Sequence, residues 1–186
     1  MNCSGKQAAT LAAAKLNGWS TETNMDPNHP LQLIIKDSIE EISGVEVESV
    51  AVDGCGVPLF STTVTGVAQS FRKLGLAKAG TAEHHVAQEM RPHPFLIAGK
   101  NQPNTLTIED SNGSLSKGGA DGEVLGISTA EGASVGVRVI DGGLTITTVI
   151  AIPALEKIGA LPKGSLLEHP KLGVTIIRRW NVGWGH

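Results

Sequence analysis

The order in which helical and strand patterns follow one another is the strongest constraint on the fold of this chain. Helical patterns dominate its first half, and alternating patterns typical of paired strands dominate the later part. This order favours an α+β fold in which an antiparallel sheet is flanked by helices. The 186 residues suffice for one hydrophobic core, so we expect a single domain over residues 1–186.

The first helix is predicted over residues 4–17. Ser4 and Gln7 have the spacing of a capping box with Ser4 as the N-cap, and Asn17-Gly18 marks the end. A loop rich in proline and asparagine follows, in which His29 is expected to act as an anchoring hydrogen-bonding group. The next helix is predicted to place its apolar residues on one face: Leu31, Ile34, Ile35, Ile39 and Ile42, together with Ser38.

The alternation of valine with polar residues over 45–52 predicts a half-buried strand with its apolar face inward. This strand ends immediately before Asp53 and Cys55. The remaining predictions are helices over 63–76, 81–91 and 144–158, a hairpin formed by 123–129 and 134–141, and a last strand over 173–180. Residues 98–113 fit either a polar loop or a short helix, and the threonines of 144–158 would also suit a strand.

Composition excludes several classes of function. The formal net charge is −3 without a basic stripe, which argues against a nucleic-acid partner, and aromatic residues are too few to stack on bases. Two cysteines without a signal peptide suit a reducing cytoplasm, and no apolar run approaches the roughly 20 residues of a membrane span. We therefore expect a soluble cytoplasmic protein.

The only two cysteines lie in short polar motifs, Cys3-Ser4-Gly5-Lys6 and Asp53-Gly54-Cys55-Gly56. Thiolate, amine and carboxylate groups together are typical of a soft-metal or nucleophile site, if the fold brings the motifs together. Cys3 and Lys6 share one side of a helix start, and Asp53 and Cys55 are alternate residues at a strand end. The alternatives are a buried Cys3, a solvated Lys6 and an ordinary turn at Asp53-Gly54.

Two further residues have candidate roles. Ser4 is interpreted as a helix cap rather than a nucleophile, because Lys6 is too close in sequence to act as its base. Lys117 precedes Gly118-Gly119, and small residues after a lysine at a strand edge let a substrate approach closely. Serine hydrolases that use lysine as a base have this arrangement.

Together, these segments resemble the rhizobial-type L-asparaginase II family, which are serine-lysine amidohydrolases. The matching segments follow the family order over nearly the whole chain: Asn2-Cys3-Ser4-Gly5-Lys6, Asp26-Pro27-Asn28-His29-Pro30-Leu31-Gln32, Asp53-Gly54-Cys55-Gly56-Val57-Pro58, Arg91-Pro92, Ala98-Gly99, Lys117-Gly118-Gly119-Ala120-Asp121-Gly122 and Val139-Ile140-Asp141-Gly142.

The resemblance implies a fold related to serine β-lactamases and glutaminases, and hydrolysis of the side-chain amide of L-asparagine to aspartate and ammonia. It also implies that Cys3, Lys6 and Cys55 bind zinc, with Asp53 beside the metal-bound water. Lys117 corresponds to a lysine of the catalytic serine-lysine tandems. The family's usual homodimer is the expected assembly.

The chain departs from the family pattern in three respects. The nucleophilic serines, one of them in a Ser-x-x-Lys element, belong to an N-terminal portion that has no counterpart here, so we expect an incomplete domain or a complementing polypeptide. Gln7 stands where histidine is usual, and Lys100-Asn101 replaces a run containing arginine, so substrate-binding residues stay unassigned. The alternatives are an inactive remnant that acts as a metal-binding or assembly module, and a structural fragment without metal.

Overall fold

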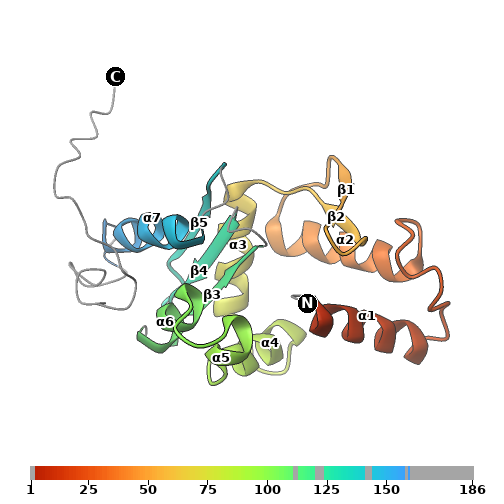
Figure 1. The fold of residues 1–186 in the computed structure, drawn as a ribbon, viewed down its shortest axis with the longest axis horizontal. Coiled ribbons are helices and arrows are strands. Elements are labelled where there is room, and N and C mark those ends of the chain that lie inside the picture. Colours follow the sequence, from red (N-terminus) through yellow and green to blue (C-terminus); the bar gives the residue numbers. More distant parts are fainter. Residues whose placement is uncertain (1–2, 111–112, 120–123, 141–143, 158, 160–186) are drawn as a thin grey trace. The chain divides into compact units, whose positions relative to one another are not determined.

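The computed structural model describes residues 3–110, 113–119, 124–140, 144–157 and 159. The chain divides into two compact units, Met1–Ser70 and Phe71–His186, and helix α3 (Val64–Gly75) contributes residues to both. Helices combine with small antiparallel sheets, which confirms the predicted α+β class (Figure 1). The strand predicted over 173–180 lies outside the described residues.

The first unit contains two helices and a short hairpin before α3 begins (Figure 1). These are α1 (Ser4–Leu16), α2 (Pro30–Ser43), β1 (Val50–Val52) and β2 (Pro58–Phe60). Helix α2 contacts both α1 and β2. The buried apolar side chains of this unit are Ala14, Leu31, Val47, Val57 and Phe60.

The start of α1 differs from the predicted capping box. Cys3, not Ser4, is the N-cap, and no side chain makes a capping hydrogen bond there. The Cys3 carbonyl accepts the first helical bond from the Gln7 amide at 2.9 Å. Ser4 is already the first helical residue, which is one position too late for its hydroxyl to act as the N-cap. The predicted end is confirmed, since Asn17 is the C-cap and Gly18 has a φ of +70°.

His29 anchors the loop before α2, as predicted. Its buried ring caps the helix, because Nδ1 accepts a hydrogen bond from the Leu31 amide at 3.1 Å. An amide can only donate, so Nε2 carries the ring proton and donates to the Ser20 carbonyl at 3.0 Å. The predicted apolar face of α2 is right only in part, because Leu31 is buried whereas Ile34 is 51% exposed.

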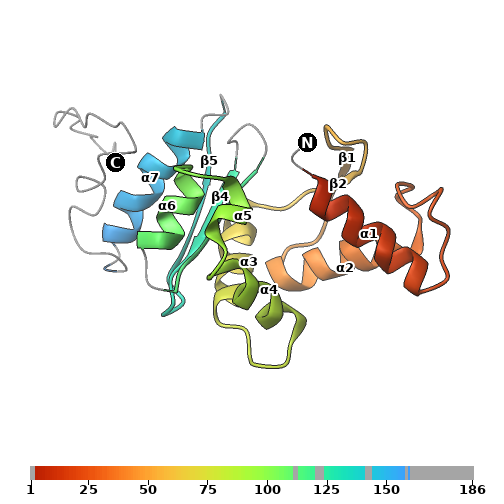
Figure 2. The same ribbon diagram turned by 60° about the horizontal axis from the view of Figure 1, so that its bottom comes forward.

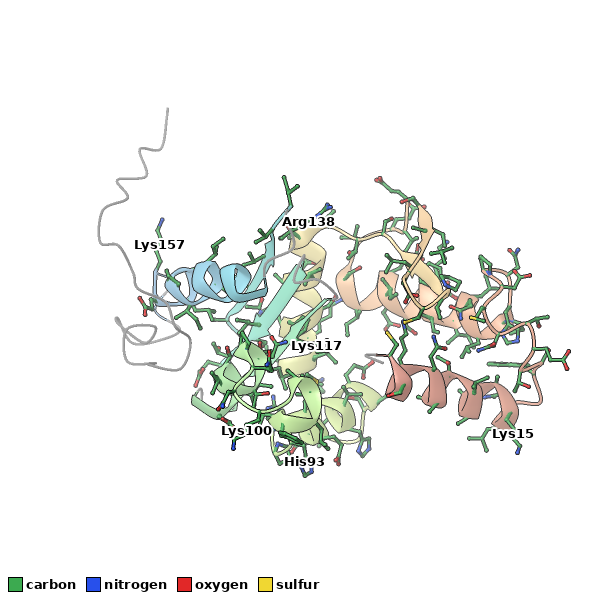
Figure 3. The ribbon with its side chains drawn as sticks, in the orientation of Figure 1. Lys15, His93, Lys100, Lys117, Arg138 and Lys157 are labelled. Atoms are coloured by element: carbon green, nitrogen blue, oxygen red, sulfur yellow. The ribbon has the colours of Figure 1, made fainter. Side chains whose placement is uncertain are left out.

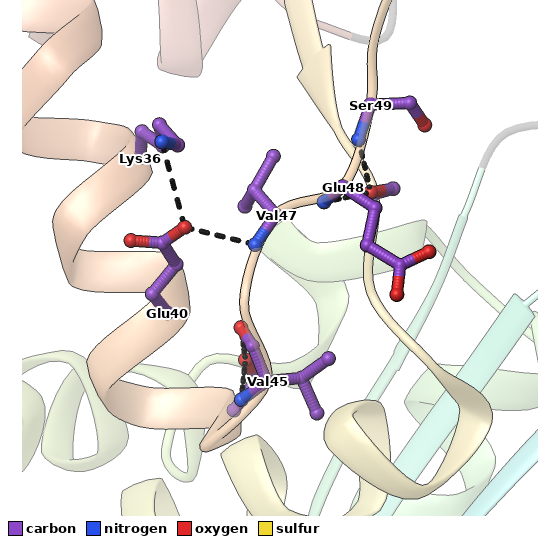
Figure 4. A network of polar contacts seen from close by, with 8 residues as sticks. Lys36, Glu40, Val45, Val47, Glu48 and Ser49 are labelled. Atoms are coloured by element: carbon purple, nitrogen blue, oxygen red, sulfur yellow. Dashed lines mark hydrogen bonds and ion pairs between the residues drawn. The ribbon is translucent and has the colours of Figure 1, made fainter.

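The predicted strand over 45–52 is mostly wrong: only Val50–Val52 forms a strand, and it is exposed. The backbone before it bonds to side chains instead of a neighbouring strand (Figure 4). The Val47 amide donates to a Glu40 carboxylate oxygen at 2.8 Å, and the next two amides donate to the Ser61 hydroxyl at 3.1 and 3.0 Å. Because these backbone amides already donate to side chains, they are not used for hydrogen bonds to a neighbouring strand, and the alternating sequence over residues 45–49 does not form a strand.

The second unit is a three-stranded antiparallel sheet with helices. After α3 come α4 (Ala82–Met90), α5 (Pro94–Ala98), α6 (Pro103–Asp110), β3 (Leu115–Gly118), β4 (Val124–Ser128), β5 (Ser134–Arg138) and α7 (Leu144–Lys157). The helices predicted over 63–76, 81–91 and 144–158 and the hairpin are confirmed. Within 98–113 the short-helix alternative is correct, and β3 was not predicted as a strand.

The strand order is β3-β4-β5, so β4 is central. Helices α6 and α7 cover one face of this sheet (Figure 2). On that face Ile127 packs with Val137, Ala151 and Leu155. Side chains alternate between faces along a strand, so the opposite face carries Gly126. A cross-strand row there joins Lys117, Gly126 and Gly136.

Arg91, the C-cap of α4, connects three segments of the second unit. Its Nε donates to the Gly113 carbonyl just before β3, and its Nη2 donates to the Gly75 carbonyl at the end of α3, both at 2.9 Å. Each bond has a charged donor, which makes it stronger than a bond between neutral groups. The side chain of Arg91 therefore helps to fix the position at which β3 begins. Arg91 is also the residue at which α4 was predicted to end.

Helix α3 makes two close contacts that depend on a glycine, one at its own Gly66 and one between its Phe71 and Gly126 of β4. A Cβ on Gly66 would lie 3.1 Å from Val45 and 3.2 Å from Ser43, both in the first unit. In the second unit, a Cβ on Gly126 would lie 2.2 Å from two ring carbons of Phe71 on α3. No side chain fits at position 126 unless the ring moves.

We expect Gly126→Ala to destabilise the protein by about 1–3 kcal/mol, because the new methyl group overlaps the Phe71 ring. A double variant with Phe71→Leu should lose less stability than the sum of the two single variants, measured by urea denaturation. Gly5→Ala is the control, since its Cβ would have no neighbour within 4 Å. Additive losses would show that the overlap does not determine the effect.

Candidate functional site

The turn between β1 and β2 is held by its own polar groups. The Asp53 amide donates to the Val57 carbonyl at 2.9 Å, and the Gly56 amide donates to the Asp53 carbonyl at 3.0 Å. Gly56 has a φ of +84°, a conformation that favours glycine. Asp53 Oδ1 also accepts from the amides of Cys55 at 2.7 Å and Val57 at 3.1 Å. The predicted turn at Asp53-Gly54 is thus present, and it fixes the carboxylate.

The start of α1 meets this turn. The sulfur atoms of Cys3 and Cys55 and a carboxylate oxygen of Asp53 all lie within 4.8 Å of one another. Both cysteines are free thiols; Cys3 is half-buried and Cys55 is exposed. The fold therefore brings together two motifs that are about fifty residues apart in sequence. We call Cys3, Lys6, Asp53 and Cys55 the cysteine cluster.

Lys6 joins the cluster through an ion pair. Its Nζ donates to Asp53 Oδ2 at 2.6 Å, with side-chain exposures of 45% for Lys6 and 19% for Asp53. This hydrogen bond raises the pKa of Lys6 above 10.5 and lowers the pKa of Asp53 below 3.8. Water screens a pair this exposed, so its contribution to stability is about 1 kcal/mol or less.

The pH range of this stabilisation follows from the two shifts. The contribution of Asp53 is present above its unfolded pKa and is lost as pH falls through the lowered folded pKa. The contribution of Lys6 is present below its unfolded pKa and is lost as pH rises through the raised folded pKa. The pair is therefore intact across the neutral range.

The two thiols add groups that could bind a metal. A hydrogen bond with Cys3 raises the pKa of Cys55 above its usual range. Two sulfurs, a carboxylate and an amine form a donor set that suits zinc, in which tetrahedral Zn–S bonds of about 2.3 Å place two sulfurs about 3.8 Å apart. The cluster therefore fits zinc after a small inward movement, provided that the thiols and Lys6 release their protons.

Lys117 lies in the other unit, on the edge strand β3 (Figure 3). It is exposed, faces Gly126 across the ladder, and its Nζ donates to the Gly118 carbonyl. In addition to the predicted Gly118, Gly126 faces Lys117 on the neighbouring strand β4, and Gly136 continues the same row on β5, one strand further. These two glycines were not identified from the sequence, because only the strand register reveals them.

The sequence also contains two Ser-x-x-Lys patterns that the sequence reasoning missed. One is Ser114-Leu115-Ser116-Lys117, in which Ser114 is buried immediately before β3, and the other is Ser70-Phe71-Arg72-Lys73 on α3. The Ser70 hydroxyl donates to the Gly66 carbonyl at 2.8 Å, a bond within the helix. Its proton is therefore directed at the backbone rather than at a base. This geometry does not favour Ser70 as a nucleophile.

Replacing Asp53 separates its two structural roles. Asp53→Asn keeps an oxygen for the turn amides and loses the charge, so we expect a loss below about 1 kcal/mol. Asp53→Ala also removes the turn bonds and should cost about 1 kcal/mol more, as measured by urea denaturation. Both variants should lower the pKa of Lys6 towards 10.5 by NMR titration. Equal losses in the two variants would contradict a role of Oδ1 in the turn; Asp37→Asn, on the exposed part of α2, is the control.

Among the described residues, no helix combines the length and the apolar character needed to span a bilayer. No curated protein matches the sequence. The family model for L-asparaginase II matches residues 1–185, which is nearly the whole chain, and supports an asparaginase-like function at the level of the family. The chain therefore belongs to the L-asparaginase II family.

Proposed function

We propose that this chain is the metal-binding part of an amidohydrolase that converts L-asparagine to aspartate and ammonia. The observation that carries the proposal is the cysteine cluster, in which Cys3, Asp53 and Cys55 converge beside Lys6. The family match over residues 1–185 supports the class of reaction. The antiparallel sheet with Lys117 on its edge strand is consistent with a fold related to serine β-lactamases.

In this proposal, Cys3, Lys6 and Cys55 hold zinc, and Asp53 lies beside them. Bound zinc supplies a Lewis acid that stabilises negative charge on a nearby oxygen. Lys6 must lose its proton to become a ligand, and the ion pair with Asp53 at 2.6 Å opposes this loss until a metal cation competes for the amine. The same carboxylate is held by two backbone amides, so its orientation does not depend on Lys6.

The proposed hydrolysis proceeds through an acyl-enzyme. A serine hydroxyl attacks the side-chain amide carbon, the C–N bond breaks, and ammonia leaves after taking up a proton. Water then cleaves the ester and releases aspartate and the serine. Lys117 is the proposed proton carrier: its neutral amine accepts the hydroxyl proton and returns it to the leaving nitrogen. The nucleophilic serine is expected from a complementing polypeptide that carries the family's Ser-x-x-Lys element.

Metal analysis of the purified chain tests the cluster. We expect one zinc per chain, and Cys3→Ala and Cys55→Ala should each lose it because a thiolate ligand is removed. Ser4→Ala is the matched control: it is adjacent to Cys3 and exposed, and it should keep the metal. Wild-type chain that binds no zinc would reject this part of the proposal.

Ammonia release from L-asparagine tests the reaction, with the chain alone and after addition of the complementing polypeptide. Lys117→Arg should lower turnover by about 10²–10⁴-fold, since arginine keeps the charge and cannot serve as a base. The zinc content should not change. Lys78→Arg, also exposed in the second unit, should retain full activity. Zinc binding without turnover in either mixture would favour the alternative of an inactive metal-binding or assembly module.

A further inference from the structure

We propose that Cys3 and Cys55 form a reversible dithiol–disulfide couple that controls whether the cysteine cluster can accept a metal. The consequence for the metal rests on the proposed function, whereas the cross-link itself does not. The oxidant is a disulfide of low molecular weight, such as oxidised glutathione. Cross-linking would join the start of α1 to the turn between β1 and β2.

The positions of the sulfur atoms support this couple. They lie within 4.8 Å of each other, and the sequence contains no third cysteine to compete within the chain. A disulfide requires the sulfurs to approach to about 2.05 Å. The ion pair between Lys6 and Asp53 already holds the same two segments together at 2.6 Å. The entropy of closing the long loop between them has therefore already been lost on folding.

The surroundings leave room for this movement. A Cβ on Gly54 would meet no heavy atom within 4 Å, and one on Gly56 would meet only Met25 Sδ at 3.8 Å. Cys55 lies between these glycines, in an exposed turn whose backbone is not packed in the core. The turn can therefore move its sulfur towards Cys3 without disturbing a buried side chain.

The different exposure of the two cysteines determines which thiol reacts with the oxidant first and which closes the disulfide. The exposed Cys55 thiolate attacks the oxidant, which forms a mixed disulfide and releases the first small thiolate. The Cys3 thiolate then attacks the Cys55 sulfur, which closes the protein disulfide and releases the second small thiolate. Two electrons pass from the protein sulfurs to the oxidant, and the two thiol protons pass to solvent.

A disulfide would remove both thiolates from the donor set. The Lys6 amine and the Asp53 carboxylate would remain, and they lack the soft ligands that select zinc. Bound zinc should in turn protect the thiols, since the metal and the oxidant compete for the same sulfur atoms. The cysteine cluster can therefore hold either a disulfide or a zinc ion, but not both.

The experiment uses the full chain, freed of metal with a chelator and treated with mixtures of oxidised and reduced glutathione. We expect mass spectrometry to show the loss of two hydrogen atoms and a peptide that links Cys3 to Cys55. Dithiothreitol should restore the free thiols. Adding zinc first should slow oxidation by the factor expected from its binding constant. A wild-type chain that collects only glutathione adducts, without an internal disulfide, would overturn the proposal.

Two variants separate the steps. Cys3→Ser should accumulate a stable glutathione adduct on Cys55, because the thiol that resolves it is missing. Cys55→Ser should react more slowly, because only the half-buried Cys3 remains. Equal rates in the two variants would contradict the proposed order of attack.

Zinc binding to the oxidised and reduced wild-type chains tests the control of metal binding. Zinc on the reduced chain alone is the expected result. Equal zinc binding by the oxidised and the reduced chain would show that the disulfide does not regulate metal binding. A disulfide that forms in a chain unable to bind zinc when reduced would reject the metal site of the proposed function and leave the thiol couple intact.

Discussion

The carboxylate of Asp53 is the group on which the candidate site depends. One oxygen accepts two backbone amides and so gives the hairpin turn its shape, and the other accepts the Lys6 ammonium at the start of α1. A single side chain thus organises one segment and attaches it to another. The two cysteines approach each other because each lies close to one end of this connection: Cys3 is the N-cap of α1, and Cys55 lies two residues after Asp53.

Sequence patterns predicted the parts of the fold in which local and tertiary preferences agree. The helices α3, α4 and α7, the hairpin β4–β5 and the anchoring role of His29 are all present. The failures at Ser4 and at residues 45–52 have a common cause. In both places the pattern was compatible with the prediction, but the hydrogen-bond partners were different: the helix began one residue earlier, and Glu40 and Ser61 took the amides that a strand would have used.

The site was predictable in composition and not in geometry. The sequence indicated thiols, an amine and a carboxylate in two motifs, and the resemblance to a family assigned them to one centre. Neither could show that Lys6 pairs with Asp53, or that the Asp53 turn is built from its own amides. The row from Lys117 through Gly126 to Gly136 also depends on register, because these residues lie on three strands and align only in the sheet.

The packing of α3 has a consequence for how this helix unfolds. Gly66, in its first turn, fits against Ser43 and Val45, and Phe71, five residues later, lies against Gly126. A short helix is unstable without the surfaces on which it packs, so it cannot persist when one half has lost its support. Each half of α3 therefore depends on the contact that its own unit provides, at Gly66 or at Phe71. A substitution that loosens one of these contacts should fray the helix from that end first.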